Sequence, residues 1–172
     1  MRYNVGIKLL MIDVDGTLTD GTVFYGDQKM EIKAFNIKDG LIIKALSNLG
    51  INVVFLTGRE SAATERRAAE LGATAIQGVE DKETKMNELF IEYGVKPEQS
   101  AYIGDDLNDY AAMSICGFKA CPADAASEIQ DICDYISPLS GGHGAVRDIC
   151  EYMLKQNGSY SDLLDSYIDE RN

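Results

Sequence analysis

IKLLMIDVDGT, residues 7 to 17, joins an apolar run to two closely spaced carboxylates. The apolar stretch Ile7 to Ile12, which ends near a glycine turn, is typical of a buried parallel strand. Its carboxyl end would carry Asp13 and Asp15 at the edge of the sheet where α/β proteins bind ligands. Two like charges this close are unfavourable unless a cation or a proton lies between them. A solvated acidic turn explains the pair equally well, so the motif alone does not decide the chemistry.

Other polar segments follow apolar stretches in the same way. The strand-like Asn52 to Leu56 ends in Thr57, and Lys82 opens a helical stretch. Ala101 to Ile103 runs into the acidic segment GDDLND, residues 104 to 109. The chain therefore supplies, in order, two aspartates, a threonine, a lysine and an acidic cluster. This set suits phosphoryl transfer because it offers a nucleophile, donors for phosphate oxygens and oxygen ligands for Mg²⁺.

The bulk composition indicates one soluble globular domain and argues against polyanionic partners. The chain has 172 residues, of which 45% are hydrophobic and 26% charged, as in ordinary globular domains. Its net charge of −12 argues against nucleic acid and anionic membranes as partners. That charge is compatible with a small anionic substrate held by local basic groups. No stretch approaches the roughly 18 apolar residues that a membrane span requires.

Cysteine usage and the first residues predict a cytoplasmic protein. The first strand begins so early that we expect no secretory signal. The cysteines show no CxxC spacing and His143 is the only histidine, which argues against a zinc site. We expect reduced thiols at Cys116, Cys121, Cys133 and Cys150.

Strand and helix patterns alternate from Ile7 to Gln156, which predicts an α/β fold with a Rossmann-like parallel sheet and helices on both faces. We expect one domain over residues 1–156 and a mobile acidic tail over residues 157–172. Asp39 and Ser61 are the expected N-caps of two helices. The predicted helices are Asp39–Leu49, Ser61–Leu71, Asp81–Tyr93, Asn108–Ile115 and Gly144–Gln156, with late strands at Phe118–Cys121 and Tyr135–Ile136.

One segment interrupts the alternation directly after the first strand. Thr22 to Tyr25 and Met30 to Phe35 are strand-like and flank the turn Gly26-Asp27, which predicts an inserted β-hairpin over about residues 19–35. The hairpin carries more apolar side chains than a projecting hairpin should expose. It either folds back on its own domain or packs against another subunit, and we favour the subunit interface.

The ordered set of motifs resembles the haloacid dehalogenase (HAD) superfamily of phosphotransferases. In that scheme Asp13 attacks phosphorus to form an aspartyl-phosphate, and Asp15 serves as general acid and then as general base. Thr57 and Lys82 bind the transferring phosphoryl oxygens. Taken singly, Thr57 is explained as a turn hydroxyl and Lys82 as a solvated helix lysine. We prefer Lys82 to Lys85 because it stands at the helix entrance.

The same resemblance implies a Mg²⁺ cofactor. The metal would be held by the Asp13 carboxylate, the main-chain carbonyl of Asp15 and Asp105. Asp106 and Asp109 are supporting acidic residues, which either bind through water or orient the lysine. The second aspartate favours phosphatase or phosphomutase chemistry.

Across nearly the whole chain the sequence resembles one capless branch of the superfamily, the phosphatases of 3-deoxy-D-manno-octulosonate 8-phosphate (KDO 8-phosphate). The inserts between motifs are too short for a cap domain, so the site should be open unless a neighbouring subunit covers it. The resemblance implies a homotetramer whose hairpins meet in a central barrel. It is carried by the segments LLMIDVDGTLTDG, KAFNIKDG, TGRE, IQGVEDK, YIGDDLND and GGHGAVRD.

The resemblance also implies substrate-binding residues. Arg59 and Arg67 stand where this branch carries arginines, and a guanidinium suits the carboxylate of a sugar acid. Gly16 and Gly58 would let the backbone approach the phosphate. Arg147 follows a glycine-rich loop that the resemblance places close to the site.

Three other functions stay open at this point. Close relatives of the branch remove the 9-phosphate from KDN or N-acetylneuraminate, which would connect the protein with sialic acid rather than lipopolysaccharide synthesis. That nine-carbon branch tends to place an acidic residue where Arg59 stands. A phosphatase of broad or different specificity is also compatible with an open site. A non-catalytic, phosphatase-like regulatory subunit is the third alternative, and the intact motif set argues against it.

Overall fold

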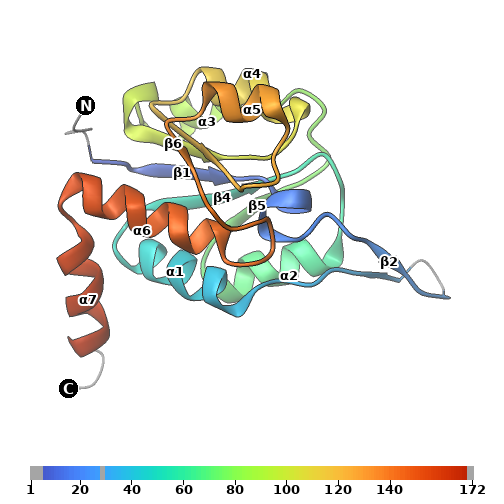
Figure 1. The fold of residues 1–172 in the computed structure, drawn as a ribbon, viewed down its shortest axis with the longest axis horizontal. Coiled ribbons are helices and arrows are strands. Elements are labelled where there is room, and N and C mark those ends of the chain that lie inside the picture. The colour runs from blue at the N-terminus through green and yellow to red at the C-terminus, as the bar shows by residue number, and fades with distance from the viewer. Residues whose placement is uncertain (1–5, 28–29, 170–172) are drawn as a thin grey trace.

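The computed structural model describes residues 6–27 and 30–169 and contains a six-stranded parallel sheet (Figure 1). The strand order β5-β4-β1-β6-β7-β8 places β1 between β4 and β6. Ile12 at the end of β1 pairs with Phe55 on one side and Ile103 on the other. The predicted Rossmann-like α/β fold is confirmed. The strands are β1 Leu9–Ile12, β4 Asn52–Leu56, β5 Thr74–Ile76, β6 Ser100–Ile103, β7 Phe118–Cys121 and β8 Tyr135–Ile136.

Helices cover both faces of the sheet, which explains why β1 is apolar throughout. Side chains alternate along a strand, so Leu10 and Ile12 pack in one core while Leu9 and Met11 pack in the other. None of the described helices is long and apolar enough to cross a membrane. The first core is covered by α1 (Ile37–Asn48), α2 (Ala62–Leu71), α6 (Ala145–Asn157) and α7 (Tyr160–Asp169), and the second by α3 (Lys82–Glu92), α4 (Tyr110–Ser114) and α5 (Ser127–Ile132).

The N-cap of α1 differs from the prediction. Asn36 has the extended backbone of a cap, and its side chain accepts a hydrogen bond from the backbone N–H of Lys38 at 2.8 Å. Asp39, the predicted cap, lies buried in the first turn and accepts from the backbone N–H of Arg147 at 2.8 Å. The prediction for Asp39 is wrong because this carboxylate caps α6 across the domain instead of its own helix. Ser61 does occupy the N-cap position of α2, but its side chain makes no capping hydrogen bond.

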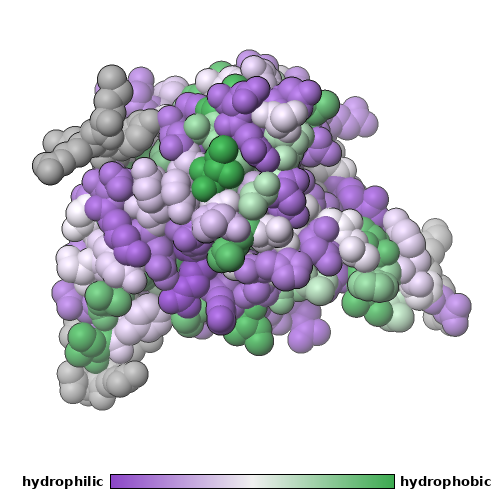
Figure 2. All heavy atoms as spheres, in the orientation of Figure 1, coloured by the Kyte–Doolittle hydropathy of each residue, from purple (hydrophilic) through white to green (hydrophobic). Residues whose placement is uncertain are grey.

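The predicted hairpin is present, with shorter strands than expected. β2 (Phe24–Tyr25) and β3 (Glu31–Ile32) pair antiparallel, and Gly26 N–H donates to the Met30 carbonyl at 2.8 Å. Figure 2 shows hydrophobic side chains gathered on this projection. These side chains are 49% to 72% exposed, so no part of the chain within the described residues covers them: Phe24, Tyr25, Met30 and Ile32.

The segment predicted as a mobile tail contains a helix. α7 (Tyr160–Asp169) packs against α6 and α1, and the Tyr167 hydroxyl donates to the Leu41 carbonyl at 3.1 Å. Its apolar residues recur at helical spacing, which gives the acidic segment one face to bury. Leu163 lies at the centre of that face and is 3% exposed. The helix therefore adds to the core on the α1 side of the sheet.

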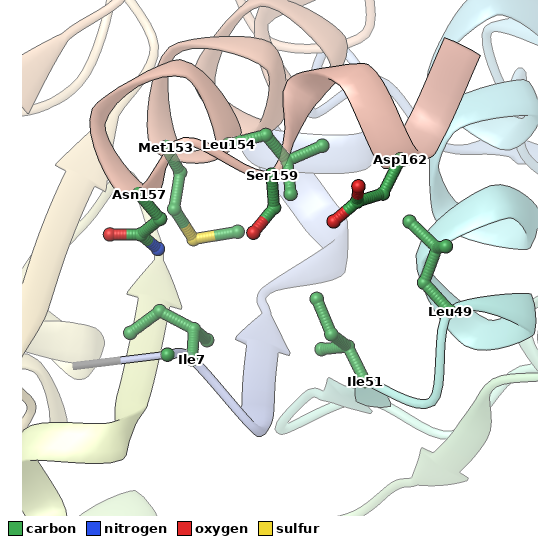
Figure 3. A pocket seen from close by; sticks show the side chains of 9 residues that line it. Ile7, Leu49, Ile51, Met153, Leu154, Asn157, Ser159 and Asp162 are labelled. Atoms are coloured by element: carbon green, nitrogen blue, oxygen red, sulfur yellow. The ribbon is translucent and has the colours of Figure 1, made fainter. Parts of the chain in front are cut away.

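A cavity of about 180 Å³ lies at the amino end of the sheet. Ile7 and Ile51, which precede β1 and β4, face the side chains of Met153 and Asn157 from α6 across it (Figure 3). The polar motifs of the sequence lie instead at the carboxyl ends of the strands. The cavity is therefore distinct from the site that the sequence predicts.

We expect the buried side chain of α7 to contribute strongly to stability. Leu163→Ala should lower the free energy of unfolding by about 2–4 kcal/mol, because it leaves a cavity in the core. Leu164→Ala is the matched control on the same helix, since Leu164 is 49% exposed; it should change stability by about 0.5 kcal/mol or less. Urea unfolding followed by circular dichroism measures both, and equal effects would contradict the packing of α7.

Candidate active site

Strand ends bring the predicted residues to one edge of the sheet. Asp13 follows β1, and its backbone N–H donates to the Ile103 carbonyl of β6 at 2.9 Å. Thr57 follows β4, and Asp105 comes shortly after β6. Because these strands are parallel neighbours, their carboxyl ends lie side by side. Residues that are far apart in the sequence thus share one site.

Lys82 connects the carboxylates of this site. Its ammonium lies 2.5 Å from Asp13 Oδ1 and 2.7 Å from Asp109 Oδ1, and its side chain is 2% exposed. Lys82 is the first residue of α3, which Asp81 caps by accepting from the backbone N–H of Thr84. Burial alone would lower the pKa of Lys82, but Asp13 and Asp109 raise it above its ordinary value. The lysine is therefore a fixed positive charge next to the predicted nucleophile.

Asp109 holds the lysine in place. Besides Lys82 it accepts from the Tyr102 hydroxyl at 2.8 Å and from the backbone N–H of Asp105 at 3.1 Å. Its carboxylate is fully buried, so these donors replace the lost water. Asp106 is exposed and accepts from the backbone N–H of Leu107. Of the two supporting aspartates, Asp109 orients Lys82 and Asp106 caps the turn.

Three carboxylates form a cluster suited to a divalent cation. Carboxylate oxygens of Asp13, Asp105 and Asp109 lie within 4.8 Å of one another. Burial raises the pKa of Asp105 to about 6, and the charges of Asp109 and Asp106 add to the effect. Burial and the charge of Asp109 also raise the pKa of Asp13 well above its usual range, although Lys82 opposes this. A hard cation with oxygen ligands would relieve this repulsion, so the residues fit Mg²⁺.

The loop after Asp13 approaches Asp105 so closely that only glycine fits at residue 16. Gly16 has φ +101°, and a Cβ there would collide with the Asp105 carboxylate. The Thr17 hydroxyl donates to Asp105 Oδ1 at 2.9 Å. From the other side Gly142 N–H donates to the Thr17 carbonyl at 3.1 Å, and a Cβ at Gly141 would collide with the Gly16 carbonyl. The glycine-rich loop therefore packs against the loop that follows Asp13.

Asp15 faces a second group of charges, which comes from the hairpin and from the turn after β4. Lys33 Nζ lies 2.6 Å from Asp15 Oδ1, and Arg59 Nε lies 3.9 Å from Asp15 Oδ2. Arg59 in turn donates to Glu31 at 2.7 Å and to the Tyr25 hydroxyl at 3.0 Å. Burial alone would raise the pKa of Glu31, but Arg59 and Lys33 hold it below its ordinary value. Arg59 is thus at the site, with part of its charge already paired.

The neighbouring motif residues fall where the sequence predicts. Thr57 is buried, and its hydroxyl accepts from the backbone N–H of Arg59 at 3.2 Å. Gly58 lies between them in the turn after β4. Lys85, the alternative lysine, pairs with Glu88 on the exposed surface of α3. The preference for Lys82 is consistent with this geometry.

Two predicted arginines have other contacts. Arg67 donates to the Asn36 carbonyl at 3.2 Å and lies over the Phe35 ring, and it lines an open hollow of about 290 Å³ that Lys33 also borders. Arg147 pairs with Glu151 at 2.8 Å and lines the groove against α7. The structure does not bring the Arg147 guanidinium into contact with the site residues. The helix geometry explains this, because the i, i+4 partner draws the side chain along α6.

Sequence reasoning missed two residues of the site. Tyr102 looks like an ordinary core residue of β6, yet its hydroxyl is buried against Asp109. Lys33 follows a strand in which apolar and polar residues alternate, so the sequence pattern predicts a solvent-exposed lysine. Its burial depends on Asp15, and the only signal for it was its place at the start of the KAFNIKDG segment.

Comparison with known proteins shows a consistent relationship. A family model for haloacid dehalogenase-like hydrolases matches residues 32–117. The 3-deoxy-D-manno-octulosonate 8-phosphate phosphatase of Yersinia pestis is 42% identical over 140 residues, which cover 81% of this chain and 75% of that protein. The phosphatase of the same name from Moraxella catarrhalis, solved with magnesium ion, phosphate and KDO, has a TM-score of 0.89 at 39% identity, covering 96% of this chain and 94% of that one. A cobalt-bound deoxy-D-mannose-octulosonate 8-phosphate phosphatase from Haemophilus influenzae has a TM-score of 0.87 at 38% identity, covering 94% of each chain.

Gly16→Ala should weaken Mg²⁺ binding, because the new Cβ displaces the Asp105 carboxylate. We expect a loss of about 10-fold or more, the range seen when the groups that orient metal ligands are removed. Gly21→Ala is the control: Gly21 also has positive φ, but a Cβ there meets nothing closer than 3.7 Å. Calorimetric titration with Mg²⁺ compares the two variants, and unchanged affinity in Gly16→Ala would contradict the role given to this contact.

Proposed function

The chain belongs to the haloacid dehalogenase-like hydrolases and, within them, to the KDO 8-phosphate phosphatases. We therefore propose that it hydrolyses KDO 8-phosphate to KDO and phosphate, with Mg²⁺ as cofactor. The observation that carries the proposal is the buried Asp13 carboxylate, held 2.5 Å from Lys82 and beside Asp105 at the end of the central strand. A buried carboxylate that lies beside the Lys82 ammonium and the Asp105 carboxylate is suited to attack phosphorus.

The proposed reaction has two steps. In the first, an oxygen of Asp13 attacks phosphorus, the bond from phosphorus to the sugar oxygen breaks, and Asp15 gives its proton to that oxygen. KDO leaves as an alcohol and an aspartyl-phosphate remains on Asp13. In the second, Asp15 accepts a proton from water as the water oxygen bonds to phosphorus. The bond to Asp13 then breaks and phosphate is released.

The other residues stabilise charge during both steps. Lys82 is adjacent to the attacking carboxylate, and we assign to it and to Thr57 the equatorial phosphoryl oxygens. Asp13, Asp105 and the Asp15 carbonyl would hold Mg²⁺, which supplies Lewis-acid stabilisation of the phosphoryl group. Asp109 is buried behind Lys82 and completes the acidic cluster.

We assign the carboxylate-bearing sugar of the substrate to the part of the site next to Arg59. Arg59 lies next to Asp15, the residue that meets the leaving oxygen, so its guanidinium is within reach of the sugar. A hollow lined by Lys33, Arg66 and Arg67 also contains Glu70, which pairs with both arginines. These positions support an anionic sugar. Arg59 favours the eight-carbon substrate, because the nine-carbon branch tends to carry an acidic residue at this position.

Phosphate release from KDO 8-phosphate and KDN 9-phosphate, measured side by side with Mg²⁺, tests the proposal. We expect kcat/KM to favour the eight-carbon sugar by at least about tenfold, or ~1.4 kcal/mol. Removal of Mg²⁺ with EDTA should abolish turnover. Asp13→Asn is the control for contaminating phosphatases and should show only background release. The reverse preference would assign the protein to the nine-carbon branch, and no turnover of any phosphate monoester would refute the phosphatase itself.

We also propose that the hairpin joins subunits of a homotetramer. Its four exposed apolar side chains are more than a solvated two-stranded hairpin normally carries, and no other part of the described chain covers them. A neighbouring subunit seated there would lie next to Arg59 and the open hollow, because Arg59 contacts both strands of the hairpin. The partner would therefore help to enclose the sugar.

Phe24→Asp should break this assembly, since it buries an unpaired charge in an apolar contact. Size-exclusion chromatography with light scattering should show a tetramer for the parent protein and smaller species for the variant. Ile91→Asp on α3 is the control because Ile91 is 84% exposed and lies away from the hairpin; it should leave the tetramer intact. A monomeric parent protein would refute the proposed assembly.

We place the enzyme in the cytoplasm. The four cysteines are free, and three of them are buried. Unpaired thiols suit a reducing compartment.

A further inference from the structure

Two lysines of the described chain are buried, and Lys33 is the one that the proposed reaction leaves without a role. Its side chain is 0% exposed, and its ammonium lies 2.6 Å from Asp15 Oδ1 and 3.5 Å from Glu31 Oε1. A lysine is almost never buried without an ionic partner, because desolvation of the charge is costly. Its burial therefore depends on these carboxylates, and Asp15 is the closer of the two.

The two carboxylate oxygens of Asp15 differ in their hydrogen bonding. Oδ1 accepts the charged hydrogen bond from Lys33. Oδ2 has no hydrogen-bond partner, although it is shielded from solvent and faces Arg59 at 3.9 Å. Such a short, charge-assisted bond fixes the rotation of the carboxyl group. One oxygen is thus anchored while the other is available for a proton transfer.

The anchor belongs to the hairpin. Lys33 directly follows β3, and Glu31 within β3 accepts from Arg59 at 2.7 Å. The ion pairs of Lys33 with Asp15 and of Glu31 with Arg59 therefore attach β3 to the domain. A buried ion pair is by itself weak evidence for a stabilising role, because its attraction barely offsets desolvation. A role in orienting Asp15 explains why the charge is placed here.

We propose that Lys33 is a positioning residue that holds the carboxyl group of Asp15 so that its free oxygen faces the leaving oxygen, which makes the hairpin part of the acid–base machinery. The inference rests on the proposed function, in which Asp15 protonates that oxygen as its bond to phosphorus breaks. The hairpin then serves both the subunit contact and the proton transfer.

The effect of Lys33→Met should depend on how much the leaving group needs its proton. With an alkyl phosphate such as KDO 8-phosphate, kcat/KM should fall by about 10-fold to 100-fold. This is less than the roughly 10²- to 10⁴-fold that a general acid contributes, because Lys33 orients the acid and does not itself supply the proton. With 4-nitrophenyl phosphate, whose leaving group departs readily as an anion, the loss should be about threefold or less. Lys44→Met, which removes an exposed lysine from α1, is the control and should change neither value.

A double-mutant cycle separates this role from a structural one. If Lys33 acts through Asp15, adding Lys33→Met to Asp15→Asn should cause little further loss with the alkyl phosphate, whereas independent effects would add. Equal losses with both substrates, or additive losses in the cycle, would overturn the proposal. Lys33→Gln allows the same comparison if the methionine variant does not fold. If the parent enzyme cleaves neither substrate, the proposed function fails before Lys33 is tested.

Discussion

The buried charge of Lys82 is the interaction on which the site depends. It lies between Asp13 and Asp109, and without it two buried carboxylates would face each other with no cation between them. Removing one partner from such a buried group typically costs about 3–5 kcal/mol. Lys82 therefore ties the start of α3 to the end of the central strand and to the turn after β6. The same contacts that stabilise these strand ends place a fixed positive charge where a phosphoryl group would be transferred.

Close backbone approach is the second constraint. Gly16 and Gly141 leave no space for a Cβ, because the loop after β1 is packed between Asp105 and the loop before α6. Asp39 strengthens the same region by capping α6 from α1. The turn that carries Asp105 and the loop before α6 thus hold the loop after β1 from opposite sides. Such preorganisation suits a site in which charge positioning supplies most of the catalysis.

The hairpin takes the place that a cap domain would occupy, since the described elements between β1 and β4 are the short turn Val14–Leu18, the hairpin and α1. A two-stranded hairpin is marginal alone, and here its inner side is fixed by Lys33, Glu31 and Arg59 while its apolar side is left exposed. Tyr25 and Glu31, which pair across the strands, lie on the side that meets Arg59, whereas the paired Phe24 and Ile32 lie on the opposite side. One small insert therefore has the features needed to shape the site and to meet another subunit.

The sequence by itself determined the fold class, the hairpin and the principal site residues, because these depend on local periodicity and on motif order. An apolar run such as Ile7 to Ile12 has to be buried on both faces, and parallel strands bring Asp13, Thr57 and Asp105 to one edge whatever the loops between them do. Contacts between distant segments were decided only by the tertiary structure. The pattern GDDLND does not show that Asp109 is buried on Lys82 while Asp106 faces solvent.

The same limit explains the differences elsewhere. Asp39 looks like a local cap, but its partner is Arg147 on α6. Lys33 looks solvated until the hairpin places it on Asp15. α7 looks like a polar tail because its apolar residues are few, and it becomes a helix by packing them on α1 and α6. For Asp39 and Lys33 the free energy comes from burying a charged group against a partner remote in sequence, which no local pattern records. The apolar residues of α7 do recur at helical spacing, but a helix this short needs packing against α1 and α6 for its stability.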